Sequence, residues 1–119
     1  MFSVRYLCLA LTLLAVPLPA LADTPEELLA AASALYDLKR YKEAAPKLEM
    51  FLTNYPTHAK VGPAALALGR CRSEMREFKK AVPAYEKAIA SKNPAVMVMA
   101  QLGLGESAVY GEMFDKAPD

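Results

Sequence analysis

A pattern of an aromatic residue, two further residues and an alanine occurs three times in this chain at nearly constant spacing. The copies are Tyr41–Ala44, Phe78–Ala81 and Phe114–Ala117, so their alanines lie 37 and then 36 residues apart. Each alanine is preceded, twelve residues earlier, by a small residue that ends a pair. These pairs are Ala31-Ala32, Leu68-Gly69 and Leu104-Gly105. A fixed period of this length indicates a repeat architecture in which each unit packs against the next. We therefore expect stacked units rather than one conventional globular core.

Apolar residues recur at helical spacing along the chain, as in Ala44, Leu48, Phe51, Leu52 and Tyr55,. No stretch shows the alternation of apolar and polar residues that is typical of a strand. Alanine is abundant and favours helix by propensity. The sequence therefore predicts an all-α fold.

Helix starts and breaks divide the chain into five segments. Thr24 is predicted to cap the first helix, with Pro25 at the first helical position and Glu27 completing a capping box,. Asn93-Pro94 offers a similar start,. Breaks are expected near Lys39-Arg40, Pro56-Thr57, Arg76-Glu77, Asn93-Pro94 and Gly111. Five helices of about 12–17 residues fit between these breaks, with the short connections of antiparallel neighbours.

The repeat carries the residues of the tetratricopeptide pattern, whose period is about 34 residues. After the alanine of the two complete units come Leu48 or Tyr85, then Phe51-Leu52 or Ala88-Ile89, and finally Pro56 or Pro94. On these residues the chain resembles a tetratricopeptide-repeat (TPR) protein over residues 25–117. The units span about 25–58, 59–94 and an incomplete 95–119 within a domain of residues 23–119. The resemblance implies a short right-handed α-solenoid of about five helices.

One segment is most similar to bacterial envelope members of that family. Residues 51–56, followed by 78–89, resemble the periplasmic coordinator of the Tol-Pal system and the outer-membrane assembly lipoproteins. This resemblance implies a periplasmic protein-interaction role.

Small residues in the pattern have a packing role, because two helices approach closely only where side chains are small. Ala32, Gly69 and Gly105 are expected to admit the partner helix, with Ala44 and Ala81 doing so from the other side. Tyr41 and Phe78 are expected to fill the wedge between one helix pair and the next.

Two features depart from the family pattern. The turn glycine is missing at Lys39 and Arg76, so these turns must accept a non-glycine conformation or a tighter helix end,. Pro46 and Pro83 lie just inside the second helices, where we expect them to be tolerated only within the first turn,.

Residues 1–22 have the features of a secretory signal peptide. Arg5 is followed by an apolar run from Tyr6 to Val16, and Ala20-Leu21-Ala22 offers a small-x-small cleavage site,. The run is too short for a membrane anchor, which needs about 20 residues. We expect cleavage after Ala22, a periplasmic or secreted product and no stable membrane span after cleavage.

Charge and cysteine content exclude several function classes. A formal charge of +1 gives no electrostatic case for nucleic acid,. Cys71 is the one cysteine left after cleavage, so it is either a buried thiol or a partner in an intermolecular disulfide,. His58 is alone in a predicted loop and is expected at the surface. No catalytic constellation, metal site or cofactor site is predicted, and the chain is not expected to be an enzyme.

The resemblance implies a concave groove lined by the first helices of successive units. The candidate partner-binding residues in this groove are Ser33, Tyr36, Asp37, Arg70, Glu74, Glu106 and Tyr110. Tyrosine and arginine are common interface anchors, so Tyr36, Arg70 and Tyr110 lead this set. The alternative is an ordinary solvated helix face. Between Lys60 and Lys92, eight basic residues face three acidic ones, which indicates either a solvated face or a surface for an acidic partner.

The sequence thus predicts an exported scaffold of the cell envelope that binds a protein or peptide partner. Two alternatives stay open: a helical arm of a larger envelope enzyme, and a self-assembling structural module. The third unit is incomplete, so the face that carries Leu104 and Ala108 is expected to lack its usual cover. Either the chain is a piece of a longer protein, or this edge binds something such as a second copy.

Overall fold

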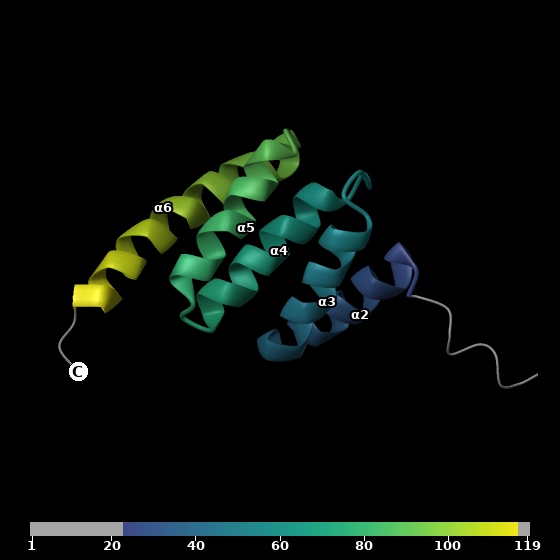
Figure 1. The fold of residues 1–119 in the computed structure, drawn as a ribbon, viewed down its shortest axis with the longest axis horizontal. Coiled ribbons are helices and arrows are strands. Elements are labelled where there is room, and N and C mark those ends of the chain that lie inside the picture. The colour runs from purple at the N-terminus through teal and green to yellow at the C-terminus, as the bar shows by residue number, and fades with distance from the viewer. Residues whose placement is uncertain (1–22, 117–119) are drawn as a thin grey trace, which may run out of the picture.

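A computed structural model describes residues 23–116 of the chain, and the predicted signal peptide lies outside this part. The helices are α2 (Pro25–Asp37), α3 (Tyr41–Asn54), α4 (Val61–Glu74), α5 (Phe78–Ala90) and α6 (Pro94–Lys116). They follow one another in chain order across the molecule (Figure 1). The described residues contain no strand, which confirms the all-α prediction.

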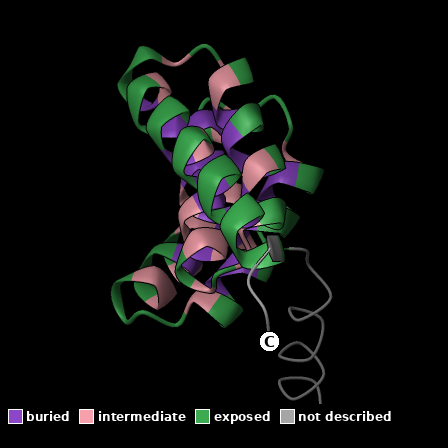
Figure 2. Ribbon diagram, turned by 90° about the vertical axis from the view of Figure 1, so that its left-hand side faces the viewer, coloured by how far each residue is buried: buried purple, intermediate pink, exposed green. Residues whose placement is uncertain are grey.

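Each helix packs against the next one along the chain, and α4 also contacts α6. Short connections between the helices allow this, and they occur at the first four predicted breaks. Buried residues gather between the helices, while the outer surfaces are exposed (Figure 2). Many of the buried residues are alanines, which let the helix backbones approach closely: Ala32, Ala44, Ala45, Ala64, Ala65, Ala81, Ala84, Ala88 and Ala100.

The start of α2 is the predicted capping box. The Thr24 hydroxyl accepts a hydrogen bond from the Glu27 amide at 3.1 Å, and the Thr24 amide donates back to the Glu27 carboxylate at 3.4 Å. At the start of α6, the Asn93 side-chain oxygen accepts from the Ala95 amide at 3.0 Å. Both starts predicted from the sequence are therefore confirmed.

The predicted break at Gly111 is wrong, because α6 continues through it to Lys116. Glycine within a helix costs only about 1 kcal/mol relative to alanine, and tertiary contacts outweigh this. Here Phe78 of α5 packs its ring against Tyr110 and Phe114, with centroid distances of 5.4 and 5.5 Å. These two contacts hold the helical turns on either side of Gly111 in register.

The expectation for the helix-interior prolines is also wrong. Pro46 and Pro83 are each the sixth residue of their helix, beyond the first turn. A proline there deprives only the carbonyl four residues earlier of its amide donor. Those carbonyls belong to Lys42 and Lys79, and all four residues are exposed, so water can reach this side of each helix.

Three turns that follow helices adopt the left-handed conformation without glycine. Lys39 and Arg76 have φ of 59° and 60°, and Lys92 follows with 56°. At the first of these turns, the Arg40 amide donates to the Leu35 carbonyl and the Lys39 amide to the Tyr36 carbonyl. This is a Schellman motif, which normally has glycine at the left-handed position. The first expectation for these turns, a non-glycine residue in the glycine conformation, is confirmed.

Replacing Lys39 or Arg76 by glycine is expected to raise the free energy of unfolding by about 0.5–1 kcal/mol. A non-glycine residue in the left-handed conformation costs roughly 1–2 kcal/mol, and glycine avoids this cost. The substitution also removes a cation from a helix C-terminus, which offsets part of the gain in stability. Urea unfolding of each variant measures the change. Glu86→Gly, at an exposed position within α5, is the control and should lose about 1 kcal/mol,. Destabilisation by Lys39→Gly would contradict the backbone assignment.

Candidate functional site

One residue of α5 joins three helices at the centre of the molecule. Tyr85 is buried, and its ring lies against Gly69 of α4 and Gly103 of α6. A Cβ atom at either glycine would lie within 2.6 Å of a ring carbon. Gly69 therefore lets α5 approach α4, as predicted. Gly103 lets α5 approach α6 in the same way, which was not predicted from the sequence. Gly105 has no atom within 4 Å of a Cβ position, so nothing in the described part of the chain packs there.

A short chain of hydroxyl groups runs beneath the surface at this point. The Tyr85 hydroxyl lies 3.1 Å from the Ser73 hydroxyl, which lies 3.3 Å from the hydroxyl of buried Ser107. Burial raises the pKa of Tyr85, so this group stays protonated at neutral pH. The three hydroxyls satisfy one another and link α4, α5 and α6.

Three hollows lie in succession over α2, α4 and α6, and together we call them the groove. The apolar hollow, of about 460 Å³, lies between α2 and α4 and includes Leu29, Ser33, Tyr36, Leu48 and Pro63. The polar hollow, of about 250 Å³, is lined by Tyr36, Arg70, Ser73, Glu74, Tyr85, Met99, Leu102, Gly103 and Glu106. The α6 hollow, of about 380 Å³, is lined by Gln101, Leu102, Gly105, Glu106, Val109 and Tyr110.

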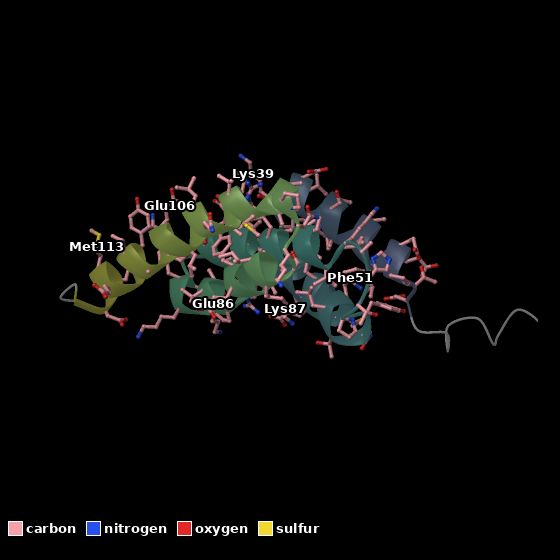
Figure 3. All side chains as sticks on the ribbon, turned by 90° about the horizontal axis from the view of Figure 1, so that it is seen from above. Lys39, Phe51, Glu86, Lys87, Glu106 and Met113 are labelled. Carbon is pink, nitrogen blue, oxygen red and sulfur yellow. The ribbon has the colours of Figure 1, made fainter. Side chains whose placement is uncertain are left out.

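Shared side chains make the hollows continuous. Tyr36 lines both the apolar and the polar hollow, while Leu102 and Glu106 line both the polar and the α6 hollow. Glu106 lies on the opposite side of the molecule from Glu86 and Lys87 of α5 (Figure 3). The groove therefore follows one side of the molecule.

The structure brings most of the predicted groove residues together. Tyr36, Arg70, Glu74 and Glu106 share the polar hollow, Ser33 lines the apolar hollow and Tyr110 lines the α6 hollow. Asp37 is exposed at the end of α2 and lines none of the three. The groove places an arginine beside two glutamates, with apolar side chains at both ends.

Tyr85, Met99 and Gly103 line the polar hollow but were not predicted as groove residues. Tyr85 comes from α5, a second helix of its pair, and its repeat position indicates packing rather than a groove. Its aromatic ring fills the gap left by two glycines and reaches the groove floor. The neighbouring Tyr36 is held by an edge-to-face contact with Tyr41, with the ring centroids 5.4 Å apart.

Basic residues on the opposite side of the molecule are paired with carboxylates. Arg72 contacts Glu49 and lies 3.2 Å from Glu77, which also lies 3.2 Å from Lys80. The hydrogen bond from Lys80, with the charge of Arg72, lowers the pKa of Glu77. Lys79 pairs with Asp115. These pairs neutralise part of the basic excess between residues 60 and 92.

His58 lies in the connection between α3 and α4, as expected, and is partly exposed. Its ring packs edge-on against Phe51 with a centroid distance of 5.2 Å, and its Nδ1 accepts the Lys60 amide at 3.1 Å. Its side chain is only 26% exposed. His58 therefore fixes the connection between α3 and α4.

Cys71 is a buried free thiol, the first of the two alternatives from the sequence. Burial raises the pKa of this thiol to about 11. We expect it to react with a thiol reagent at pH 8 at least 100-fold more slowly in the native protein than in urea, because the thiolate is the reactive species. A folded protein that reacts as fast as the unfolded one would contradict its burial.

The same thiol affects stability at alkaline pH. Its pKa is higher in the folded than in the unfolded chain, so its contribution to stability is complete below about pH 9 and is lost as the pH rises towards 11,. Cys71→Ala should reduce the fall in stability between pH 9 and 10.5 relative to the parent protein.

Comparison with protein-family models, curated proteins and solved structures found no match to this chain. Among the described residues, no helix combines the length and the apolar character needed to cross a membrane.

Proposed function

We propose that this chain is a protein-interaction module that holds a segment of a protein or peptide partner in the apolar and polar hollows of the groove. The observation that carries the proposal is their continuity through Tyr36, which places an apolar binding surface directly beside Arg70, Glu74 and Glu106. Such a groove suits a segment with an apolar side chain next to charged groups. The module acts by binding and performs no catalysis.

We further propose that the helix pairs are TPR-like units of a short right-handed solenoid. The 36–37-residue period supports this assignment. Equivalent positions also pack alike in the two complete units, since Ala44 and Ala81 are fully buried, and Leu48 and Tyr85, four residues later, are buried too. The signal features of residues 1–22 support export, so the partner is sought in the periplasm or outside the cell.

Site-specific photocrosslinking tests the proposed groove. A benzophenone amino acid is placed at Ser33, in the apolar hollow, and separately at Lys42, which is exposed on α3 and lines none of the three hollows. Crosslinking to one defined partner is expected from position 33 and not from position 42. Equal labelling from both positions would contradict the groove assignment.

Mutation then measures the contribution of single anchors to that binding. Arg70→Ala or Tyr36→Ala should weaken binding of the identified partner by about 30-fold, the effect of losing an interface anchor of about 2 kcal/mol. Lys42→Ala should leave the affinity unchanged. Circular dichroism checks that each variant is folded. Unchanged affinity in folded Arg70→Ala and Tyr36→Ala variants would overturn the proposed binding mode.

A further inference from the structure

Helix α6 is apolar on its outer side as well as on its inner side. Its inner side packs on α5 and α4 through buried residues such as Val96 and Ala100. Nine large hydrophobic residues are exposed in the described part of the chain, and seven of them lie on α6: Val98, Met99, Leu102, Val109, Tyr110, Met113 and Phe114. Exposed hydrophobic residues gathered on one element usually mark an interaction surface. Another surface is therefore expected to cover the outer side of α6.

Four of these residues form a stripe, which we call the outer stripe: Val98, Leu102, Val109 and Met113. They are 70%, 57%, 58% and 59% exposed. Their spacings of four, seven and four residues place them on one side of the helix. Met113 and Glu106 project from α6 on the side away from Glu86 and Lys87 of α5 (Figure 3).

The spacing of the outer stripe is the same when read in either direction. Its midpoint falls between Gly105 and Glu106. If two copies of α6 cross there in antiparallel orientation, Val98 faces the partner's Met113 and Leu102 faces the partner's Val109. A two-fold interface requires such a self-complementary surface, in which residue i contacts j and j contacts i.

Two further features fit this crossing. Gly105 has no atom within 4 Å of a Cβ position, so the second helix can approach closely at the midpoint. In the same register Glu106 faces the partner's Gly105 and Glu112 faces the partner's Met99, so no like charges lie directly opposite each other.

The outer stripe offers the area of a small two-fold interface. A half-exposed large side chain presents on the order of 100 Å² of surface, so its four residues offer about 400 Å² per copy, or about 800 Å² for the pair. Transient complexes bury less than about 1,200 Å² in total. A second copy of this chain therefore fits the outer stripe as a reversible partner.

We propose that two copies of this chain associate through the outer stripe of α6, antiparallel and crossing at Gly105. The second copy then fills the α6 hollow, to which Leu102 and Val109 belong. The apolar hollow has no residue on α6 and stays open, whereas the second copy covers Leu102 and Glu106 at the edge of the polar hollow. The proposal goes beyond the partner-binding function and does not depend on it.

Sedimentation equilibrium tests the association, with the protein purified in the form that the expressing cell produces. The parent protein should have twice the mass of one chain at 50 μM. Leu102→Glu and Val109→Glu should raise the dissociation constant at least 100-fold, because each copy would bury a carboxylate against an apolar residue. Leu38→Glu, at a 67% exposed hydrophobic position outside α6, is the control and should remain dimeric.

Cysteine crosslinking tests the orientation. An equimolar mixture of Leu102→Cys and Val109→Cys should form a disulfide-linked dimer at least tenfold faster than either variant alone. Faster crosslinking of each variant with itself would overturn the antiparallel register. A monomer at every concentration, with folded protein, would overturn the dimer itself. Photocrosslinking from Ser33 in Val109→Glu keeps the partner-binding function separately testable, because Val109 lines neither the apolar nor the polar hollow.

Discussion

Truncation of Phe51 to alanine is expected to lower the free energy of unfolding by about 3–5 kcal/mol, the range for a large aromatic residue removed from a core. Phe51 is fully buried within α3. Its ring contacts those of Tyr55 and His58, with centroid distances of 5.9 and 5.2 Å. The truncation therefore leaves a cavity and also loosens the connection to α4.

Urea unfolding followed by circular dichroism measures this loss. Met50→Ala is the matched control, because Met50 precedes Phe51 in the same helix and is 44% exposed. It should lose no more than about 1 kcal/mol, the typical effect of a substitution outside the core. Equal losses for the two variants would show that Phe51 is not a core residue.

Gly103→Ala and Gly105→Ala are expected to change stability in opposite directions, although they lie two residues apart in α6. At Gly103 the new methyl group would lie 2.5 Å from two ring carbons of Tyr85. That ring cannot move away, because Gly69 lies against it as well. Such overpacking costs about 1–3 kcal/mol. At Gly105 the methyl group meets nothing, and alanine should add up to about 1 kcal/mol of helix stability.

The comparison uses thermal and urea unfolding at low micromolar concentration, where association of copies contributes least. The two variants differ only in the position of one methyl group, so helix propensity cancels between them. We expect Gly105→Ala to be about 1–3 kcal/mol more stable than Gly103→Ala, the cost of overpacking alone. Equal stability would contradict the packing of Tyr85 between α4 and α6.

Helix boundaries were predictable where a local signal determines them. The Thr24 capping box and the helix start at Asn93 depend on hydrogen bonds within three residues, which the sequence displays directly. The break predicted at Gly111 was wrong for a different reason. Contacts between helices, such as those of Phe78 with α6, outweigh a local preference of about 1 kcal/mol,.

The groove was predictable only in part. The resemblance to the repeat family implied a groove with Tyr36, Arg70, Glu74 and Glu106, and the structure brings these residues to one hollow. Tyr85 could not be assigned in this way, because its contribution depends on two glycines from different helices. The prediction that Asp37 lines the groove was wrong for a simpler reason. Asp37 is the last residue of α2, where the groove has already ended.

The position of Tyr85 also bears on how the molecule opens. Its ring and hydroxyl connect α4, α5 and α6, so none of these helices can separate without exposing the same side chain. The pair α2 and α3 has no such shared residue with α5 or α6, to which it makes no extensive contact. Backbone amides of α4, α5 and α6 should therefore exchange with deuterium as one cooperative unit, while those of α2 exchange through a separate and easier opening.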